Sequence, residues 1–254
     1  MLNAERMEKI REFIVQNKFA NIKDLAVEFN TSSATIRRCL KQLENENFVE
    51  SVRGGAVLVA SGNIFEQSYQ VKRQYNIDEK IRIAQAACKY ISGNDSLFLD
   101  SSSTVFEMTK ILLTMKNISV STNDVAIASA LNQAKDISTT VTGGTLRKNF
   151  FTLSGFLAEK ALQQVSVDYA FMGVDAISPK GIFMITNTEE IGVKRAGIEC
   201  ASKVIVLCDH SKFNHLAFLN LCEYKDVDLI ITGNEMGDEA YKTYTELGLN
   251  IQLV

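Results

Sequence analysis

The sequence predicts an α/β protein of two domains, in which a small domain of three helices and a hairpin precedes a larger domain with a mostly parallel sheet. The chain has 254 residues, which is long for one domain and comfortable for a small and a medium one. Short helical patterns fill residues 1–60, whereas strand-like and helical runs alternate from about residue 81. The intervening stretch is polar and irregular, so we predict domains at 1–60 and 75–254 with a linker at 61–74.

Composition restricts the class of protein. Hydrophobic residues make up 46% and charged residues 22%, as in ordinary globular proteins. No apolar run approaches the ~18 residues of a membrane span, and the charged N-terminus does not resemble a secretory signal. The five cysteines have no regular spacing, which favours reduced thiols in a cytoplasmic protein. We therefore expect no membrane association.

The charge of the two parts differs in sign. Residues 1–60 hold nine Lys and Arg against eight Asp and Glu, a net of +1. The whole chain holds 27 and 30, which leaves 18 and 22, a net of −4, for residues 61–254. This sign is the one expected if the front segment meets phosphate and the rear segment does not.

Three helices and a hairpin are expected in residues 1–60. Apolar residues at helical spacing predict a first helix before residue 15 and a second one capped by Asn21. Ser32 is a natural N-cap for a third helix over about 33–45. Two adjacent short helices with a polar break between them form a helix-turn-helix arrangement. Apolar pairs on both sides of Arg53, Gly54 and Gly55 then predict a hairpin.

The third predicted helix has an apolar face and a basic face. Ile36, Leu40 and Leu43 lie on one side of the helical wheel, and the cations lie on the other. A basic face with a small residue suits a helix in the major groove of DNA, although a solvated basic face on a small bundle is the alternative. The candidate DNA contacts are Ser32, Ser33, Ala34, Thr35, Arg37, Arg38, Lys41, Arg53, Gly54 and Gly55.

This segment resembles the winged helix-turn-helix of the DeoR family of bacterial repressors. The resemblance rests on Ser32, on the run Thr35-Ile36-Arg37-Arg38, on Leu40 and on the tripeptide Gly54-Gly55-Ala56. The chain departs from the family pattern where Cys39 replaces Asp and Arg53 replaces His. The resemblance covers most of residues 1–60 and implies binding to double-stranded operator DNA.

Alternating runs organise the rest of the chain. Strand-like runs lie at 96–100, 118–122, 139–142, 169–174, 204–208, 229–232 and 251–254. Helical runs lie at 82–91, 104–115, 124–133, 153–164, 189–202 and 238–247. This alternation predicts a largely parallel sheet covered by helices on both faces.

Polar clusters follow several of the predicted strands. Asp100 and the run Ser101–Thr104 stand between a strand and a helix, where hydroxyls and free backbone N–H groups suit an anion, although an ordinary serine-rich N-cap is the alternative. Thr122-Asn123, Gly143-Gly144 with Arg147 just beyond, and Asp209–Lys212 follow other strands. Ligands of open α/β sheets bind beyond the carboxyl ends of the strands, so we expect a pocket there.

Residues 75–254 also resemble the sensor domain of the same family, which is related to sugar-phosphate isomerases. The matching stretches include 98–104, 143–146, 168–175, 190–195 and 209–213, with Ser102 in place of a frequent Gly. The resemblance implies a phosphorylated sugar as effector. The candidate effector-binding residues are Asp100, Ser101, Ser102, Ser103, Thr104, Thr122, Asn123, Gly143, Gly144, Arg147, Asp175, Lys194 and Lys212.

The sequence therefore predicts a DNA-binding regulator, a repressor of a carbohydrate-utilisation operon controlled by a phosphorylated sugar. One winged helix buries too little surface for operator specificity, so we expect a dimer or tetramer. The rivals are an isomerase-like enzyme with an accessory N-terminal domain and a protein–protein adaptor. No Walker A string, G-x-G-x-x-G or metal-ligand spacing is present, so we predict no cofactor or metal. An enzyme has no need of a helix with Arg37, Arg38 and Lys41 outward and a Gly-Gly wing, so we predict no enzymatic activity.

Overall fold

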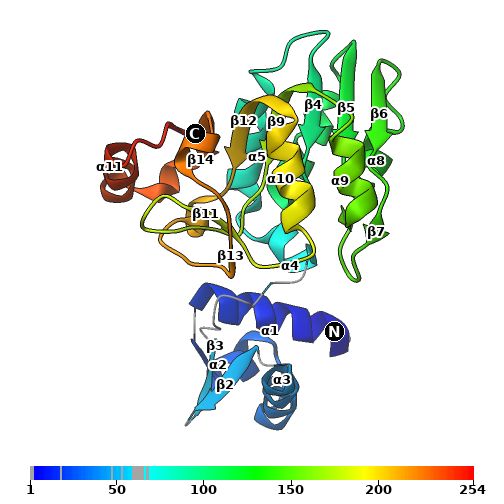
Figure 1. The fold of residues 1–254 in the computed structure, drawn as a ribbon. Coiled ribbons are helices and arrows are strands. Elements are labelled where there is room, and N and C mark those ends of the chain that lie inside the picture. The colour runs from blue at the N-terminus through cyan, green and yellow to red at the C-terminus, as the bar shows by residue number, and fades with distance from the viewer. Residues whose placement is uncertain (1–2, 18, 47, 53, 59–65, 67–68) are drawn as a thin grey trace. The chain divides into compact units, whose positions relative to one another are not determined.

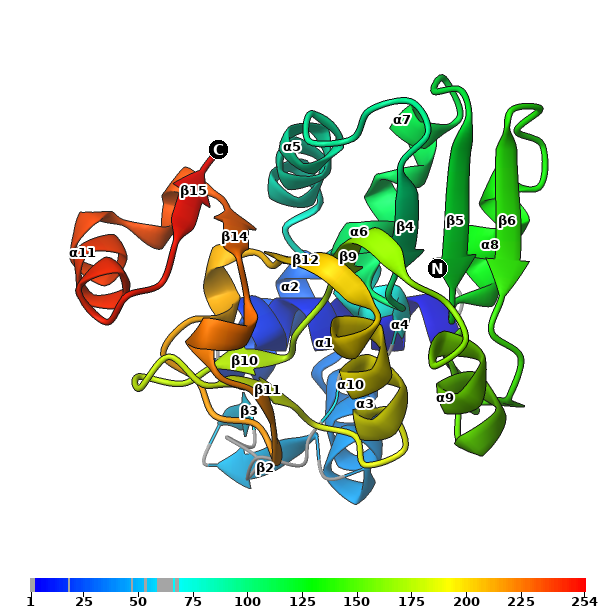
Figure 2. The same cartoon turned by 45° about the horizontal axis from the view of Figure 1, so that its top comes forward.

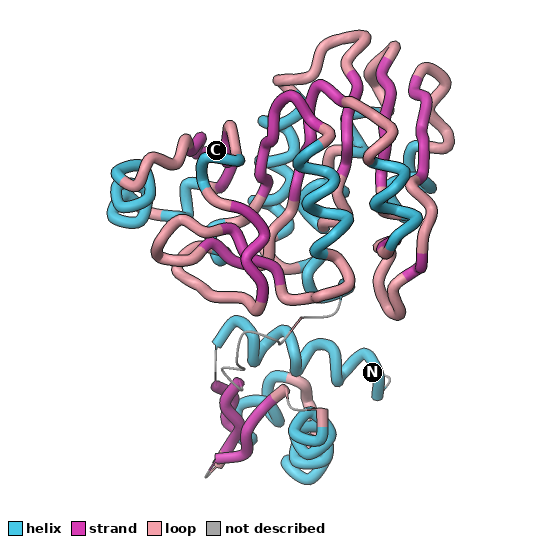
Figure 3. The backbone as a smooth tube through the Cα atoms, in the orientation of Figure 1, coloured by secondary structure: helices cyan, strands magenta, loops and turns pink. Residues whose placement is uncertain are grey.

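The computed structural model describes residues 3–17, 19–46, 48–52, 54–58, 66 and 69–254, which belong to two compact units, Met1–Phe65 and Glu66–Val254 (Figures 1 and 3). Arg53, a predicted DNA contact, lies outside the described residues. The second unit begins nine residues before the boundary that we expected at residue 75. Its first helix, α4 (Tyr69–Gln74), lies within the segment that the sequence presented as a linker.

The first unit contains the expected three helices and hairpin. Its elements are α1 (Asn3–Asn17), β1 (Phe19–Asn21), α2 (Ile22–Glu28), α3 (Ser33–Asn45), β2 (Val49–Val52) and β3 (Gly55–Leu58). The strands form an antiparallel sheet in the order β1-β3-β2, of which the sequence did not predict β1. Ile10, Leu25, Ile36 and Leu43 are fully buried, so each helix contributes to the core of this unit.

A sheet of seven parallel strands forms the centre of the second unit, which confirms the predicted fold class (Figure 1). The order is β15-β14-β12-β9-β4-β5-β6. The strands are β4 (Ser96–Leu99), β5 (Ile118–Thr122), β6 (Ile137–Val141), β9 (Val167–Met172), β12 (Ala201–Leu207), β14 (Leu229–Thr232) and β15 (Ile251–Leu253).

Helices cover both faces of this sheet, and the alternation of side chains along β4 shows why. Phe98 packs in one apolar cluster, whereas its neighbours Leu97 and Leu99 pack in another. The first cluster includes residues of α9 (Phe156–Leu162), α10 (Ile191–Glu199) and α11 (Asp238–Glu246). The second includes residues of α5 (Ile77–Cys88), α6 (Ser103–Glu107), α7 (Thr109–Leu112) and α8 (Val125–Leu131) (Figure 2).

Smaller elements surround the parallel sheet. β7 (Thr145–Leu146) and β8 (Leu153–Ser154) form a hairpin, and β10 (Ala176–Ile177), β11 (Phe183–Ile185) and β13 (Leu219–Cys222) form an antiparallel sheet. Short 3-10 turns are η1 (His210–Lys212), η2 (Tyr224–Asp226) and η3 (Asn234–Met236). Among the described residues, no helix has the length and apolar character needed to cross a membrane.

Two helical predictions are corrected by the structure. The expected helix at 153–164 begins only at Phe156, because Leu153–Ser154 is strand β8 and Gly155, with φ +85°, separates strand from helix. The expected helix at 104–115 is two short helices, α6 and α7, which meet at Met108. Apolar spacing alone did not reveal either interruption.

Candidate nucleic-acid interface and ligand cavity

Helix α3 presents the basic face that the sequence predicts. The Ser32 hydroxyl accepts a hydrogen bond from the backbone N–H of Thr35 at 3.1 Å, which caps the helix. Ile36, Cys39, Leu40 and Leu43 are buried. With that face fixed inward by the apolar core, the opposite face must point outward, and its exposed residues include Ala34, Arg37, Arg38 and Lys41.

The remaining predicted DNA contacts differ in exposure. Thr35 is half-buried, and its hydroxyl lies 3.0 Å from that of Ser32, as part of the cap. Ser33 is also half-buried. In the hairpin, Gly54 is exposed with φ +91°, a conformation that glycine adopts without strain, whereas Gly55 is buried. The exposed basic residues of α3 are therefore the part of this unit best placed to meet an anionic polymer.

A cavity of about 60 Å³ lies beyond the carboxyl ends of β4, β9 and β12. Four lysines and four carboxylates face it, so its lining is charged but balanced. The lining residues are Glu66, Tyr69, Lys72, Tyr75, Lys80, Ser101, Ser102, Ser103, Thr104, Phe150, Thr152, Gly173, Val174, Asp175, Ile185, Glu190, Lys194, Leu207, Cys208, Asp209 and Lys212.

Most of the predicted effector residues are brought together at this cavity. Those that line it are Ser101, Ser102, Ser103, Thr104, Asp175, Lys194 and Lys212. Asp100, Asn123 and Arg147 are not in the lining but each bonds to a residue that is. The Thr122 hydroxyl donates to Leu99 O at 2.6 Å and so joins β5 to β4.

Two predicted residues, Gly143 and Gly144, do not face the cavity. Gly144 has φ +110°, and a Cβ there would lie 2.6 Å from Ser154 O. Close packing against β8 accounts for this glycine, because any side chain would meet that carbonyl.

A buried ion pair supports the floor of the cavity. The Lys194 ammonium contacts Asp100 Oδ2 and donates to Gly173 O at 3.1 Å. Burial disfavours the charge on Lys194, but the carboxylates of Asp100 and Glu190 outweigh that cost and raise the pKa of Lys194. Lys194 is therefore a fixed positive charge at the cavity.

A second charged network, which the sequence did not predict, closes the other side. The Glu66 carboxylate accepts from both Nη atoms of Arg147 and from Lys72 Nζ at 2.7 Å. Lys72 Nζ also lies 2.8 Å from Asp175 Oδ1. Burial disfavours the charge on Asp175, but Lys72 outweighs it and holds the pKa of this carboxyl well below its usual range. Arg147 makes a further pair with Glu190 at 2.6 Å.

Lys80 also lines the cavity, and we did not predict it from the sequence. Burial lowers its pKa to about 8, only partly offset by the nearby carboxylate of Asp209. A signal for it exists in the sequence, because Lys80 lies three residues after Ile77 and four before Ala84, on the apolar face of α5. A lysine at such a position has to reach a buried partner or a cavity.

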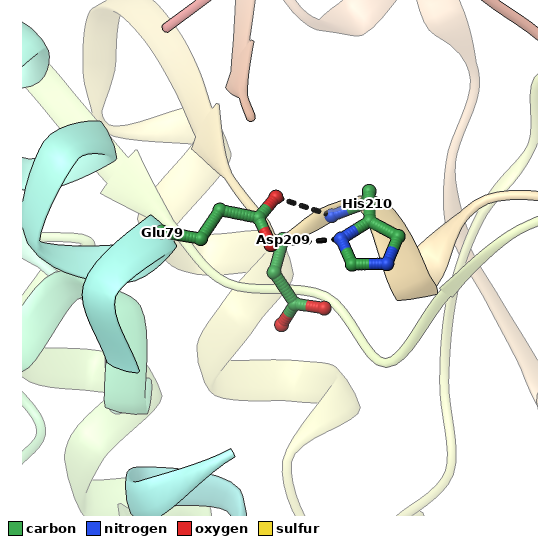
Figure 4. A group of neighbouring side chains, drawn as sticks. All are labelled: Glu79, Asp209 and His210. Carbon is green, nitrogen blue, oxygen red and sulfur yellow. Dashed lines mark hydrogen bonds and ion pairs between the residues drawn. The ribbon is translucent and has the colours of Figure 1, made fainter. Parts of the chain in front are cut away.

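Glu79, Asp209 and His210 form a compact group, with potential ligand atoms within 4.8 Å of one another (Figure 4). The Glu79 carboxylate accepts from the backbone N–H groups of His210 at 2.7 Å and Gly233 at 3.1 Å, and it lies 2.8 Å from His210 Nδ1. Lys80 Nζ lies 3.9 Å from Asp209 Oδ2. These bonds join α5 to the ends of β12 and β14.

Comparison with known proteins places both units in one family. Residues 6–62 match the model of the DeoR-like helix-turn-helix domain, and residues 75–234 match the DeoR C terminal sensor domain. The HTH-type transcriptional regulator GolR of Listeria innocua is 29% identical over 253 residues, covering 100% of this chain and 99% of its own. The glycerol-3-phosphate regulon repressor of Escherichia coli strain K12 is 28% identical over 232 residues, covering 91% of each chain.

Among solved structures, a D-ribose-5-phosphate isomerase in complex with phospho-erythronic acid is 19% identical, with a TM-score of 0.42 over 55% of this chain and 56% of that one. The family models cover the basic helix and most of the domain that holds the cavity. Both relatives are transcriptional regulators, and the similarity extends over nearly the full length of each. The predicted regulator is confirmed over its isomerase-like alternative, and the chain belongs to the DeoR family of DNA-binding transcriptional regulators.

Proposed function

We propose that this protein represses a carbohydrate-utilisation operon and that a phosphorylated sugar, bound in the cavity beyond the parallel strands, controls its affinity for the operator. The observation that carries the proposal is that seven predicted effector residues, two of them lysines, share one lining with two further lysines, Lys72 and Lys80. A phosphate group needs positive charge and hydrogen-bond donors, and Lys194 and Lys212 with the hydroxyls of residues 101–104 supply both.

The name of the glycerol-3-phosphate regulon repressor supports a small phosphorylated metabolite as the class of ligand. The effector shifts DNA affinity only by its differential affinity for two arrangements of the protein. We further propose that the chain works in the cytoplasm. We also propose that it binds DNA as a dimer or tetramer, because one module of this kind buries only roughly 600–1,000 Å² of surface on DNA. Sedimentation velocity of the purified chain tests this, and a monomer at the concentration that shifts DNA would contradict it.

Arg38→Ala tests the DNA interface directly. The variant loses one exposed cation of α3, so we expect affinity for DNA upstream of its own gene to fall several-fold and the slope of log K against log salt to decrease by about 1. Lys9→Ala is the matched control, because Lys9 is an exposed cation of α1 that pairs with Glu5 at 3.3 Å. Fluorescence anisotropy with a salt series measures both variants. Equal affinity of Arg38→Ala and wild type would remove Arg38 from the interface.

We infer that the protein binds its sugar phosphate without converting it. A thermal-shift screen of phosphorylated sugars identifies candidates, because a ligand of the native state raises the melting temperature. Each stabilising sugar phosphate is then incubated with the protein, and the products are followed by NMR. Unchanged substrate is the expected result, and isomerisation that is lost in Lys212→Ala would favour the enzyme instead.

A further inference from the structure

Described residues at the start of the second unit line the cavity. Glu66 and α4, which we call the strap, supply Glu66, Tyr69 and Lys72 to the lining, and α4 lies at the end of the sheet where the parallel strands finish (Figure 1). Glu66 follows the DNA-binding unit, Met1–Phe65, directly in the sequence. Any ligand that moves the strap therefore acts on the chain next to the DNA-binding unit.

Glu66 is bound as an anionic ligand would be. Its carboxylate takes two hydrogen bonds from the Arg147 guanidinium and one from Lys72 Nζ, and its side chain is only 11% exposed. A guanidinium fork with an added ammonium is the arrangement that proteins use for carboxylates and phosphates alike. The Arg147 guanidinium also stacks 3.7 Å from the centre of the Phe150 ring, which fixes its orientation.

Charge and space both oppose a phosphate while the strap is in place. The four lysines of the lining are balanced by Glu66, Asp175, Glu190 and Asp209, so a dianion would add to a neutral site. The cavity has a volume of about 60 Å³, far below the ~300–1,000 Å³ of pockets that hold small ligands. Withdrawal of Glu66 removes one negative charge and opens space next to Arg147 and the lysines.

One buried polar group of the strap has no hydrogen-bond partner among the described residues, as is also true of Asp209 Oδ2 elsewhere in the lining. The Tyr69 ring packs edge-on against Phe151 with 4.8 Å between ring centres, but its buried hydroxyl has no hydrogen-bond partner among the described residues. An unpaired buried hydroxyl costs free energy in the docked state. Exchange of this state for one with a bound ligand is correspondingly easier.

We propose that Glu66 is the resident anion of the effector site and that the effector's phosphate displaces it, which releases the strap. This inference rests on the proposed function, since it assumes that the cavity takes a phosphorylated ligand. It adds how occupancy of the cavity is converted into a change in the chain that joins the two units.

Hydrogen–deuterium exchange of the full chain with inorganic phosphate tests the proposal, with potassium chloride at equal ionic strength as control. A bound ligand ordinarily slows the exchange of every segment that lines its site. Displacement instead predicts slower exchange in residues 101–104 together with faster exchange in α4. Slower exchange in both segments would overturn the strap proposal and leave the site standing. No change in residues 101–104 would contradict the phosphate site itself, and the strap proposal with it.

Glu66→Gln provides the second arm. The amide keeps the shape of the side chain but not its charge, so it competes less well with phosphate for Arg147 and Lys72. We expect the Kd for inorganic phosphate, measured by calorimetry, to fall about tenfold. Glu223→Gln is the matched control, because Glu223 is an exposed carboxylate of the same unit that pairs with Lys225 at 2.8 Å and does not line the cavity. An unchanged Kd in Glu66→Gln would overturn the proposal.

Discussion

At the scale of single residues, Lys80 carries a charge that burial opposes. Its pKa in the folded protein is about 8, against an ordinary value of 10.5, and the charges around its ammonium are Asp209, Lys212, Lys72 and Glu79. Between these two pKa values the unfolded chain holds more protons than the folded one. The free energy of unfolding therefore gains a contribution that rises with pH across this window.

Lys80→Met lacks this contribution. We expect the stability of the wild type relative to Lys80→Met to increase above pH 8 by at most about 1.4 kcal/mol per pH unit. Urea unfolding of both proteins at a series of pH values measures the difference, in which the titration of the five cysteines cancels. A difference that does not vary with pH would show that Lys80 keeps its ordinary pKa.

Ser102 and Gly173 are a second residue-scale case, because they meet where two strands end. A Cβ at Gly173 would lie 2.3 Å from the Ser102 Cβ. We expect Gly173→Ala to destabilise the protein by ~1–3 kcal/mol, as overpacking does. Adding Ser102→Gly, which costs a few tenths of a kcal/mol as a changed N-cap, should restore most of that loss. Additive effects in this double-mutant cycle would contradict the contact.

At the scale of elements, periodicity in the sequence predicted the regular parts of the fold well. The parallel strands β4, β9, β12 and β14 contain continuous apolar runs, because helices cover both faces of the sheet. Helix α3 shows helical spacing, because it buries one face. β1, β7, β8 and β10 have only two or three residues, too few to show a period. The strap was missed for a different reason: its polar side chains find their partners, such as Lys72 with Asp175, only through tertiary contacts.

The same limit applies to the site. Residues such as Ser101 and Lys212 follow strands closely, where topology alone gathers ligand-binding groups. Glu66 lies far along the chain from Arg147, so no local pattern links them. Gly143 and Gly144 do not line the cavity, although a glycine pair after a strand suggested a ligand, and Gly144 packs closely against Ser154 O.

The N-cap of α3 allows an element-scale prediction. Ser32→Ala removes the acceptor for the Thr35 N–H, so we expect the local stability of α3 to fall by about 1 kcal/mol. Ser33→Ala is the control, because Ser33 is the next residue and does not cap the helix. Hydrogen exchange of the α3 amides in the full chain measures the effect. Equal exchange in the two variants would mean that the cap contributes nothing.

At the scale of the whole molecule, the chain joins a basic helix and a charged cavity in one covalent unit. The chain belongs to a family of DNA-binding regulators. In our proposal α3 presents its exposed cations to DNA, and four lysines gather around a small cavity beyond the strand ends. Among the described residues that line the cavity, those of the strap come first after the DNA-binding unit in the sequence.

The measurement that tests this account most directly is the DNA affinity of the full chain with and without a phosphorylated sugar that raises its melting temperature. We expect the sugar phosphate to change the affinity of the wild type and of Lys225→Ala, an exposed-charge control, but not that of Lys212→Ala. If the wild type binds DNA equally with and without every stabilising sugar phosphate, the cavity does not control DNA binding.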